Sequence, residues 1–196
     1  MIGIESLNQN ALDEIHKGQN IEDIRKAGAA CEKYKIRMIA SIVLGLDEDT
    51  KKDMDRSVAF AKSIHAYQLQ PAILTPFPGT PVYDQFCQDH RMITSDWSRF
   101  DMMNVTFLPK HMSPWELQET FYEASKYFYD FKSVKDIRQI FGAEYASAGS
   151  DWQSGTTGCL WRTCGFKVDQ GSVYYDLRHY SSKESTASAS KVTDVT

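Results

Sequence analysis

The sequence predicts an α/β protein built on parallel strands, followed by a helical extension and a tail of low order. Apolar runs alternate with amphipathic segments over residues 1–87, a proline-rich turn closes the third run, and a well-capped helix begins at residue 113. The chain has 196 residues and a hydrophobic fraction of 42%, which is enough to bury a sizeable core. These observations predict three regions, at 1–87, 88–141 and 142–196, with disorder from about residue 181.

The first predicted elements are a short strand and a short helix. The strand is Ile2-Gly3-Ile4, and the helix follows from Asn10, with Asp13 at its third position and Gly18 beyond its end. A buried strand at residue 2 has nothing before it to pair with. Since three parallel strands cannot close a barrel, we expect this sequence to be the back half of a larger unit.

A longer helix and a second strand follow. Asn20 is a predicted N-cap with an acid, Asp23, three residues on. Apolar residues then recur at helical spacing, at Ile21, Ile24, Cys31 and Tyr34. Residues 36–44 are apolar and β-branched almost throughout, which is typical of a strand buried on both faces of a parallel sheet.

The same plan then repeats. Thr50 and Asp53 form a capping box at the start of a third helix. Its inward stripe is Met54, Val58, Ala61 and Ile64. A third strand over residues 67–75 ends in the segment 76–81, PFPGTP, which is too rich in proline to continue a sheet.

Residues 88–112 are an irregular connection, in which Trp97, Phe100 and Phe107 are predicted to fill the core. The segment Ser113-Pro114-Trp115-Glu116 is a strong helix start, with an N-cap, a proline at N1 and an acid at N3. The apolar stripe of this helix is Leu117, Phe121, Ala124, Phe128 and Phe131.

Composition excludes several classes of function. The net charge is −4 with basic residues scattered, so no nucleic-acid partner is expected. No apolar run approaches the roughly 20 residues of a membrane helix, and the first residues lack the regions of a signal peptide. We therefore expect no membrane partner and a cytoplasmic location. The four cysteines are too few and too scattered for a disulfide framework.

Two clusters resemble metal sites but lack the required spacing. Asp47-Glu48-Asp49 does not alternate as a calcium loop does, and acids before a helix are more typical of a solvated lead-in. Cys159 and Cys164 would need two further ligands for zinc, so ordinary thiols are favoured. No nucleophile-and-base motif is present, and we predict neither catalytic nor metal-binding residues.

Polar or turn-forming residues do gather after each predicted strand, at residues 5–8, 45–49 and 76–80. Because the carboxyl ends of parallel strands meet at one edge, these loops predict a shared ligand-binding rim. Ordinary polar connections between helices and strands are the alternative explanation for any one of these loops.

Over roughly residues 1–131, the strings IGIESLNQNALDEIHKGQN, IVLGLDEDT and LTPFPGTPVY resemble, in order and spacing, the second half of a radical S-adenosylmethionine core. The similarity is closest to the subgroup with an N-terminal cobalamin-binding domain. It implies an open six-stranded βα barrel, of which residues 1–87 would form the last three βα units. Residues 97–131 would then form the helical extension.

The resemblance also implies roles for individual residues. Glu5 would contact the ribose or methionine portion of S-adenosylmethionine, and Lys17 would pair with its carboxylate. Ser41 would face the ribose and Val43 the adenine, on a strand that partly keeps a G-x-I-x-G-x-x-E pattern through Gly45 and Glu48. The predicted cofactor-binding residues are Glu5, Ser6, Lys17, Ser41, Val43, Gly45, Thr75 and Pro76.

One departure from the family is decisive for these expectations. The Cys-x3-Cys-x2-Cys motif that holds the family's 4Fe–4S cluster is absent from this sequence. The implied parent enzyme cleaves S-adenosylmethionine reductively to a 5′-deoxyadenosyl radical, with cobalamin-dependent methyl transfer as a further step, but this chain alone is expected to be inactive. Its expected partner is the missing N-terminal half of the barrel, or a second copy through open strand edges. The alternative is a non-catalytic α/β binding or interaction module.

Overall fold

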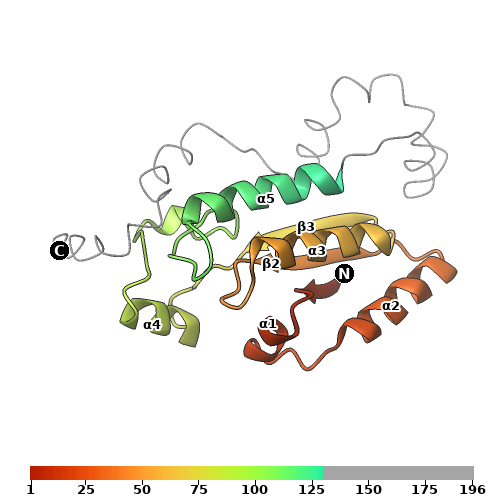
Figure 1. Cartoon of the computed structure of the whole chain (residues 1–196), viewed down its shortest axis with the longest axis horizontal. Helices are drawn as coiled ribbons and strands as arrows, with labels where there is room; N and C mark the ends of the chain where they lie inside the picture. The colour runs from red at the N-terminus through yellow and green to blue at the C-terminus, as the bar shows by residue number, and fades with distance from the viewer. Residues whose placement is uncertain (130–196) are drawn as a thin grey trace, which may run out of the picture.

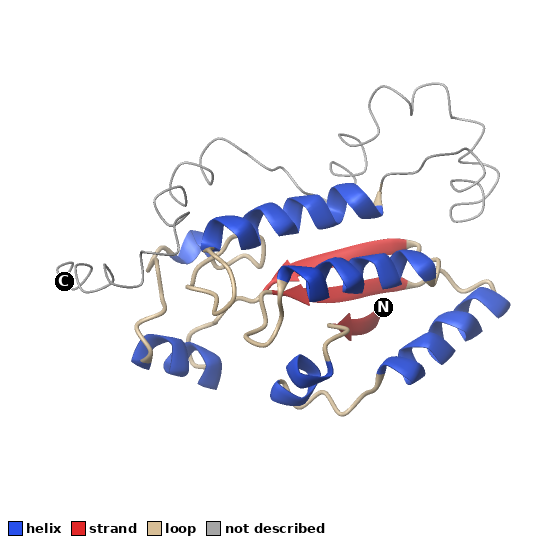
Figure 2. Cartoon of the chain, viewed as in Figure 1, coloured by secondary structure: helices blue, strands red, loops and turns tan. Residues whose placement is uncertain are grey.

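The computed structural model describes residues 1–129, which form a parallel three-stranded sheet with helices between the strands (Figures 1 and 2). The elements are β1 (Ile2–Glu5), α1 (Gln9–Glu14), α2 (Ile21–Lys33), β2 (Ile39–Leu44), α3 (Lys51–Ser63), β3 (Gln68–Ile73), α4 (Pro81–Gln88), the 3-10 turn η1 (Trp97–Arg99) and α5 (Pro114–Phe128). The strand order is β1-β2-β3, so the predicted α/β class with three parallel strands is confirmed, as an open sheet.

The two faces of the sheet have different surroundings. The helix α3 crosses in front of the strands, and α5 runs beside it (Figure 2). On this side, β2 and β3 contribute buried side chains that meet those of α3 and α5 in one core. The central members of that core are Ala40, Ile42, Leu44, Leu69, Ile73, Met54, Val58, Leu117, Phe121 and Phe128. We call this side of the sheet the covered face.

The opposite side, here called the open face, carries the alternate residues of the same strands. Ser41 and Val43 of β2 are half-buried, and Gln70 of β3 is exposed. Successive side chains of a strand point to opposite faces, so burial alternates along β2 from Ile39 to Leu44. The predicted strand buried on both faces is therefore buried on one face only in the part of the chain that the structure describes.

Local capping chemistry places the long helices where the sequence predicts them. Thr50 with Asp53, and Ser113 with Glu116, each form a complete capping box at the start of α3 and α5. The side chain of Asn20 accepts a hydrogen bond from the backbone N–H of the third helical residue of α2. These three helix starts are confirmed.

Other boundaries differ from the prediction for identifiable reasons. The short helix α1 begins at Gln9, because Asn8 is its N-cap and accepts a hydrogen bond from the Asn10 N–H. The second strand begins at Ile39, because the Ile36 N–H donates to the carbonyl of Cys31 and closes the end of α2. Ile36 is consequently 59% exposed.

The predictions for aromatic residues have different outcomes. Phe100 and Phe107 are buried as predicted, but Trp97 is 57% exposed. The Trp97 ring lies against Phe100 and Tyr83 at centroid distances of 4.9 and 6.3 Å, on the outside of α4. The prediction that Trp97 fills the core is therefore wrong. Tyr34, predicted on the apolar stripe of α2, is the C-cap of that helix and is 68% exposed.

The outer edge of β3 is closed by other parts of the chain. The hydroxyl of Tyr129 donates to the carbonyl of Leu69 at 3.1 Å and accepts from its N–H at 3.2 Å. The N–H of Ile73 donates to the carbonyl of Met102 at 2.7 Å, and Pro71 between them has no N–H to offer. We call this the sealed edge.

Several predictions lie outside the described residues. They are the position of Phe131, the region 142–196 with its predicted disorder, and the environment of Cys159 and Cys164. No helix within residues 1–129 is long and apolar enough to cross a membrane. In the described part, α5 packs on α3 and β3, so the extension shares its core with the sheet.

Candidate functional site

The loops that leave β1 and β2 meet at one rim of the sheet. The side-chain amide of Asn8 donates to the carbonyl of Glu48 at 2.6 Å, and the Ser6 hydroxyl donates to Asp49 Oδ1 at 2.8 Å. The bonded residues lie 40 and 43 positions apart in the sequence. The shared rim that parallel strands predict is therefore formed by these two loops.

A row of small and polar side chains crosses the open face in register. Gly3 pairs with Ser41, and Ser41 pairs with Gln70, so these three residues lie side by side on neighbouring strands. One step further along, Val43 pairs with Ala72. The predicted residues Ser41 and Val43 thus lie on the open face together with the exposed Gln70.

Glu5 and Lys17 form an ion pair at the β1 end of this row. Lys17 Nζ lies 2.7 Å from Glu5 Oε1, and the two side chains are 36% and 15% exposed. A Cβ added at Gly3 would lie 2.4 Å from Glu5 Oε1 and 3.1 Å from Lys17 Nζ. The pair therefore stands directly over the Gly3 backbone, in space that only glycine leaves open. The structure brings these two predicted residues together.

Ser6 and Asp49 are the buried polar pair of the rim. Ser6 is fully buried and Asp49 is 1% exposed. Burial raises the pKa of Asp49 to about 6; the Ser6 hydrogen bond opposes this shift and the nearby charge of Asp53 adds to it. The second oxygen of this carboxyl, Oδ2, has no hydrogen-bond partner among the described residues. The Ser6 hydroxyl is thus engaged inside the protein.

Asp47 is buried too, but its charge is neutralised. Arg91 binds both of its oxygens at 2.6 Å, and Lys110 lies 3.0 Å from Oδ2. Burial works to raise the pKa of Asp47, but the hydrogen bonds from Arg91 and Lys110 outweigh it and lower the pKa. The expectation of a solvated acidic lead-in is wrong for Asp47 and Asp49, because both carboxylates hold loops together. Only Glu48 is exposed.

Three other predicted residues lie at the ends of β2 and β3. Gly45 has φ of 86° and packs against α5, since an added Cβ would lie 2.6 Å from Leu117 Cδ2. Thr75 is half-buried, and its hydroxyl donates to the carbonyl of Ile73 at 3.0 Å. Pro76 is buried beside it.

Sequence reasoning missed Gln70 and Arg91. Gln70 was detectable, because Leu69 and Ile73 alternate with polar Gln68 and Gln70 along β3. Arg91 carried no local signal, since its partner Asp47 is 44 positions away. Among residues 1–129, no group of three or more histidine, cysteine, aspartate or glutamate side chains is placed to hold a metal ion.

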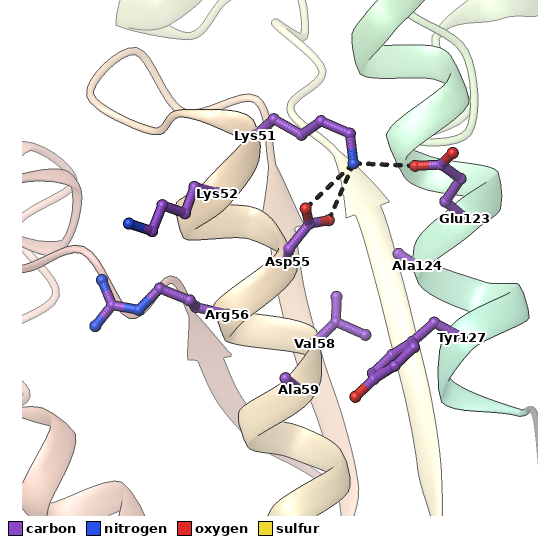
Figure 3. A pocket seen from close by; sticks show the side chains of 9 residues that line it. All are labelled: Lys51, Lys52, Asp55, Arg56, Val58, Ala59, Glu123, Ala124 and Tyr127. Carbon is purple, nitrogen blue, oxygen red and sulfur yellow. Dashed lines mark hydrogen bonds and ion pairs between the residues drawn. The ribbon is translucent and has the colours of Figure 1, made fainter.

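A surface pocket lies elsewhere, between α3 and α5 on the covered side of the sheet (Figure 3). Lys51 bridges the two helices, with its Nζ 3.2 Å from Asp55 and 3.0 Å from Glu123. These side chains are half or more exposed, so the bridges contribute little. None of the predicted cofactor residues lines this pocket.

Comparison with known proteins gives distant relatives. No family model matches the chain. The chain is 29% identical over 134 residues to the bacteriochlorophyllide d C-12(1)-methyltransferase of Chlorobaculum tepidum, covering 68% of this chain and 29% of that enzyme. It is 29% identical over 111 residues to the hopanoid C-2 methylase of Rhodopseudomonas palustris, covering 56% of this chain and 20% of that enzyme.

A cyclase is similar over more of the chain. The anaerobic magnesium-protoporphyrin IX monomethyl ester cyclase of Cereibacter sphaeroides is 22% identical over 177 residues, which are 90% of this chain and 27% of that enzyme. The chain spans about 30% of the length of the methyltransferases it matches. The chain is thus distantly homologous to parts of methyltransferases and cyclases.

Proposed function

We propose that this chain supplies part of the S-adenosylmethionine cleft of a radical S-adenosylmethionine enzyme, as the last three βα units of its barrel. Sequence similarity supports the proposal at two levels. The strand-end sequences resemble that family, and the relatives found by comparison are methyltransferases, methylases and cyclases. The whole enzyme would cleave S-adenosylmethionine reductively and, with cobalamin, transfer a methyl group.

The observation that carries the proposal is the Glu5–Lys17 pair on the open face. The amino-acid head of S-adenosylmethionine is a zwitterion, with one carboxylate and one ammonium group. Lys17 offers a cation for the carboxylate, and Glu5 offers an anion for the ammonium, with Nζ and Oε1 2.7 Å apart. The Lys17 side chain is 36% exposed, so a ligand carboxylate can reach its ammonium group from solvent.

The rest of the ligand would lie across β2. The Ser41 hydroxyl can donate to or accept from the ribose hydroxyls, and the half-buried Val43 offers an apolar surface for adenine. The backbone near Thr75 and Pro76, at the end of β3, would meet the edge of the base. This arrangement of the ligand follows the pairing of Gly3 with Ser41 and involves no side chain of the covered face.

The described residues fit S-adenosylmethionine but do not fit the iron–sulfur cluster. The sequence has no Cys-x3-Cys-x2-Cys, and Cys31 and Cys87 lie singly on α2 and α4. In the proposal this chain therefore binds and orients S-adenosylmethionine, and the partner half of the barrel brings the cluster. That half would pair with β1, where it displaces the Gln19 side chain from the carbonyl of Gly3, rather than with the sealed edge of β3.

Isothermal titration of the full chain with S-adenosylmethionine tests the proposal. We expect saturable binding that weakens at least tenfold in Lys17→Ala and in Glu5→Gln, since each change removes one charge of the pair. Lys52→Ala, an exposed lysine on α3, is the matched control and keeps the affinity. A folded chain that shows no binding, or equal affinity in all variants, overturns the proposal and favours a non-catalytic binding or interaction module.

A further inference from the structure

The turn at the end of β1 holds Glu5 in an unusual backbone conformation. Its φ is 59°, and the Ser6 N–H donates to the carbonyl of Ile4 at 2.9 Å, which closes a tight turn around Glu5. Glu5 also breaks the regular register, since it pairs with Ile42. A left-handed conformation costs a residue with a side chain about 1 kcal/mol or more, so surrounding contacts must hold it.

Those contacts come from the loop after β2. Ser6 Oγ donates to Asp49 Oδ1 at 2.8 Å and accepts from the Asn8 N–H at 3.0 Å. The Asn8 side chain donates to the carbonyl of Glu48 at 2.6 Å. The Leu7 N–H between them donates to Ser57 Oγ on α3 at 2.9 Å. The three residues after Glu5 are therefore each tied to the β2 loop or to α3.

We infer that Asp49 is a positioning residue that acts through Ser6 to fix the Glu5 turn, and so holds the Glu5 carboxylate over Gly3 for the ammonium group of an amino-acid ligand. The inference rests on the proposed function for its ligand, but its structural part concerns the free chain. Glu5 reaches its place only because the backbone reverses at that residue. The Ser6 side chain, the first beyond the reversal, is clamped by Asp49 in a fully buried position.

The chemistry of Asp49 explains why a charged group serves here. A carboxylate is a stronger acceptor for a hydroxyl than a neutral amide is. Ser6 donates a hydrogen bond to this carboxyl, and the nearby Asn8 also lowers its pKa, while the like charges of Asp53 and Glu14 raise it. Ionisation of Asp49 therefore strengthens its hydrogen bond with Ser6, although burial makes the charged form costly for the fold as a whole.

Amide resonances of the ¹⁵N-labelled full chain test the structural part without ligand. Between pH 5 and 8 we expect the Glu5 and Ser6 amides to shift together with a midpoint near 6, and this shift to vanish in Asp49→Asn. The Asn variant keeps the shape and an acceptor for Ser6, so it should fold. Asp47→Asn, in the same loop but bound to Arg91, is the matched control and keeps the titration.

Affinity for S-adenosylmethionine tests the functional part. We expect Asp49→Ala and Ser6→Ala each to weaken binding about tenfold, and the double variant to weaken it no further, because the two residues act as one unit. Lys52→Ala, the exposed control of the binding experiment, should change affinity less than twofold.

The outcomes separate the two ideas. If the wild-type chain does not bind S-adenosylmethionine, the proposed function fails, and the amide shifts alone decide whether Asp49 fixes the turn. If the wild type binds but Asp49→Ala keeps both the affinity and the Glu5 resonance, the role of Asp49 is overturned.

Discussion

The two faces of the sheet share the same three strands but differ in what their side chains do. On the covered face, Ile42, Leu44 and Ile73 are almost fully buried against α3 and α5. On the open face, Ser41 and Gln70 have polar side chains, and both remain accessible to solvent at least in part. Burial of apolar surface is the main source of stability, so the covered face holds the fold together. The side chains of the open face are therefore less constrained by packing.

The largest expected effect lies on the covered face. Phe121 is fully buried between α5 and the sheet, so Phe121→Ala should lower the free energy of unfolding by about 3–5 kcal/mol. Urea denaturation followed by circular dichroism measures this loss. Val43→Ala, which shortens an open-face side chain, is the comparison and should cost about 1 kcal/mol or less. Equal losses would remove the distinction between the faces.

The next effect concerns the rim between the faces. The folded-state pKa of Asp49, about 6, lies above its ordinary value near 4. Below about pH 4 the Asp49 carboxyl is neutral in both the folded and the unfolded chain, and the folded chain keeps its full stability. As the pH rises through 6, the unfolded chain ionises more readily than the folded one, and the free energy of unfolding falls. Asp49→Asn cannot ionise, so at pH 8 it should be about 2–3 kcal/mol more stable relative to wild type than at pH 4. Paired urea titrations at both pH values measure the difference; a pH-independent difference contradicts the assignment.

Gly45 and Gly79 have similar backbone conformations, but only Gly45 packs against another element. Its φ of 86° is strained for other residues, and an added Cβ would lie 2.6 Å from Leu117 Cδ2. Gly45→Ala should cost about 1–3 kcal/mol in thermal or urea unfolding. Gly79 has φ of 80° with no heavy atom within 4 Å of an added Cβ, so Gly79→Ala isolates the backbone cost alone. If both variants lose the same stability, the contact with α5 contributes nothing.

The smallest expected stability effect is at the open-face ion pair. Lys17→Ala should change the free energy of unfolding by less than about 1 kcal/mol, because the pair is partly exposed. The same variant should lose most of its affinity for S-adenosylmethionine. A large loss of stability would instead make the pair a structural element of the β1 turn.

The sequence predicts features that depend on neighbouring residues better than those that depend on distant ones. The capping boxes at Thr50 and Ser113 follow from contacts three residues apart, and both are present. The start of β2 was misplaced because Ile36 is apolar but serves to close α2. Residues 36–38 carry the hydrophobic pattern of a strand, and only the observed hydrogen bond shows why the strand begins later.

The site follows the same rule. Ser41 and Val43 alternate with buried neighbours, so their common face was readable from the two-residue period. The contacts of Asp47 and Asp49 were not readable, because their partners Arg91 and Ser6 lie more than forty positions away. A run of three acids gives no indication of which members are buried; that depends on how the loops pack.

The sealed edge makes the two edges of the sheet unequal as places where another strand could be added. An incoming strand at β3 would have to displace Tyr129 and Met102, and would still meet Pro71, which has no N–H to donate. Repeated addition of strands, as in fibrils, requires every added unit to present a fresh edge to the next one. Within residues 1–129, a strand added beside β1 would have to displace the Gln19 side chain, whose amide donates to the carbonyl of Gly3 at 2.8 Å, but no backbone segment. Addition of copies through the described sheet would therefore start at β1 and would not continue at β3.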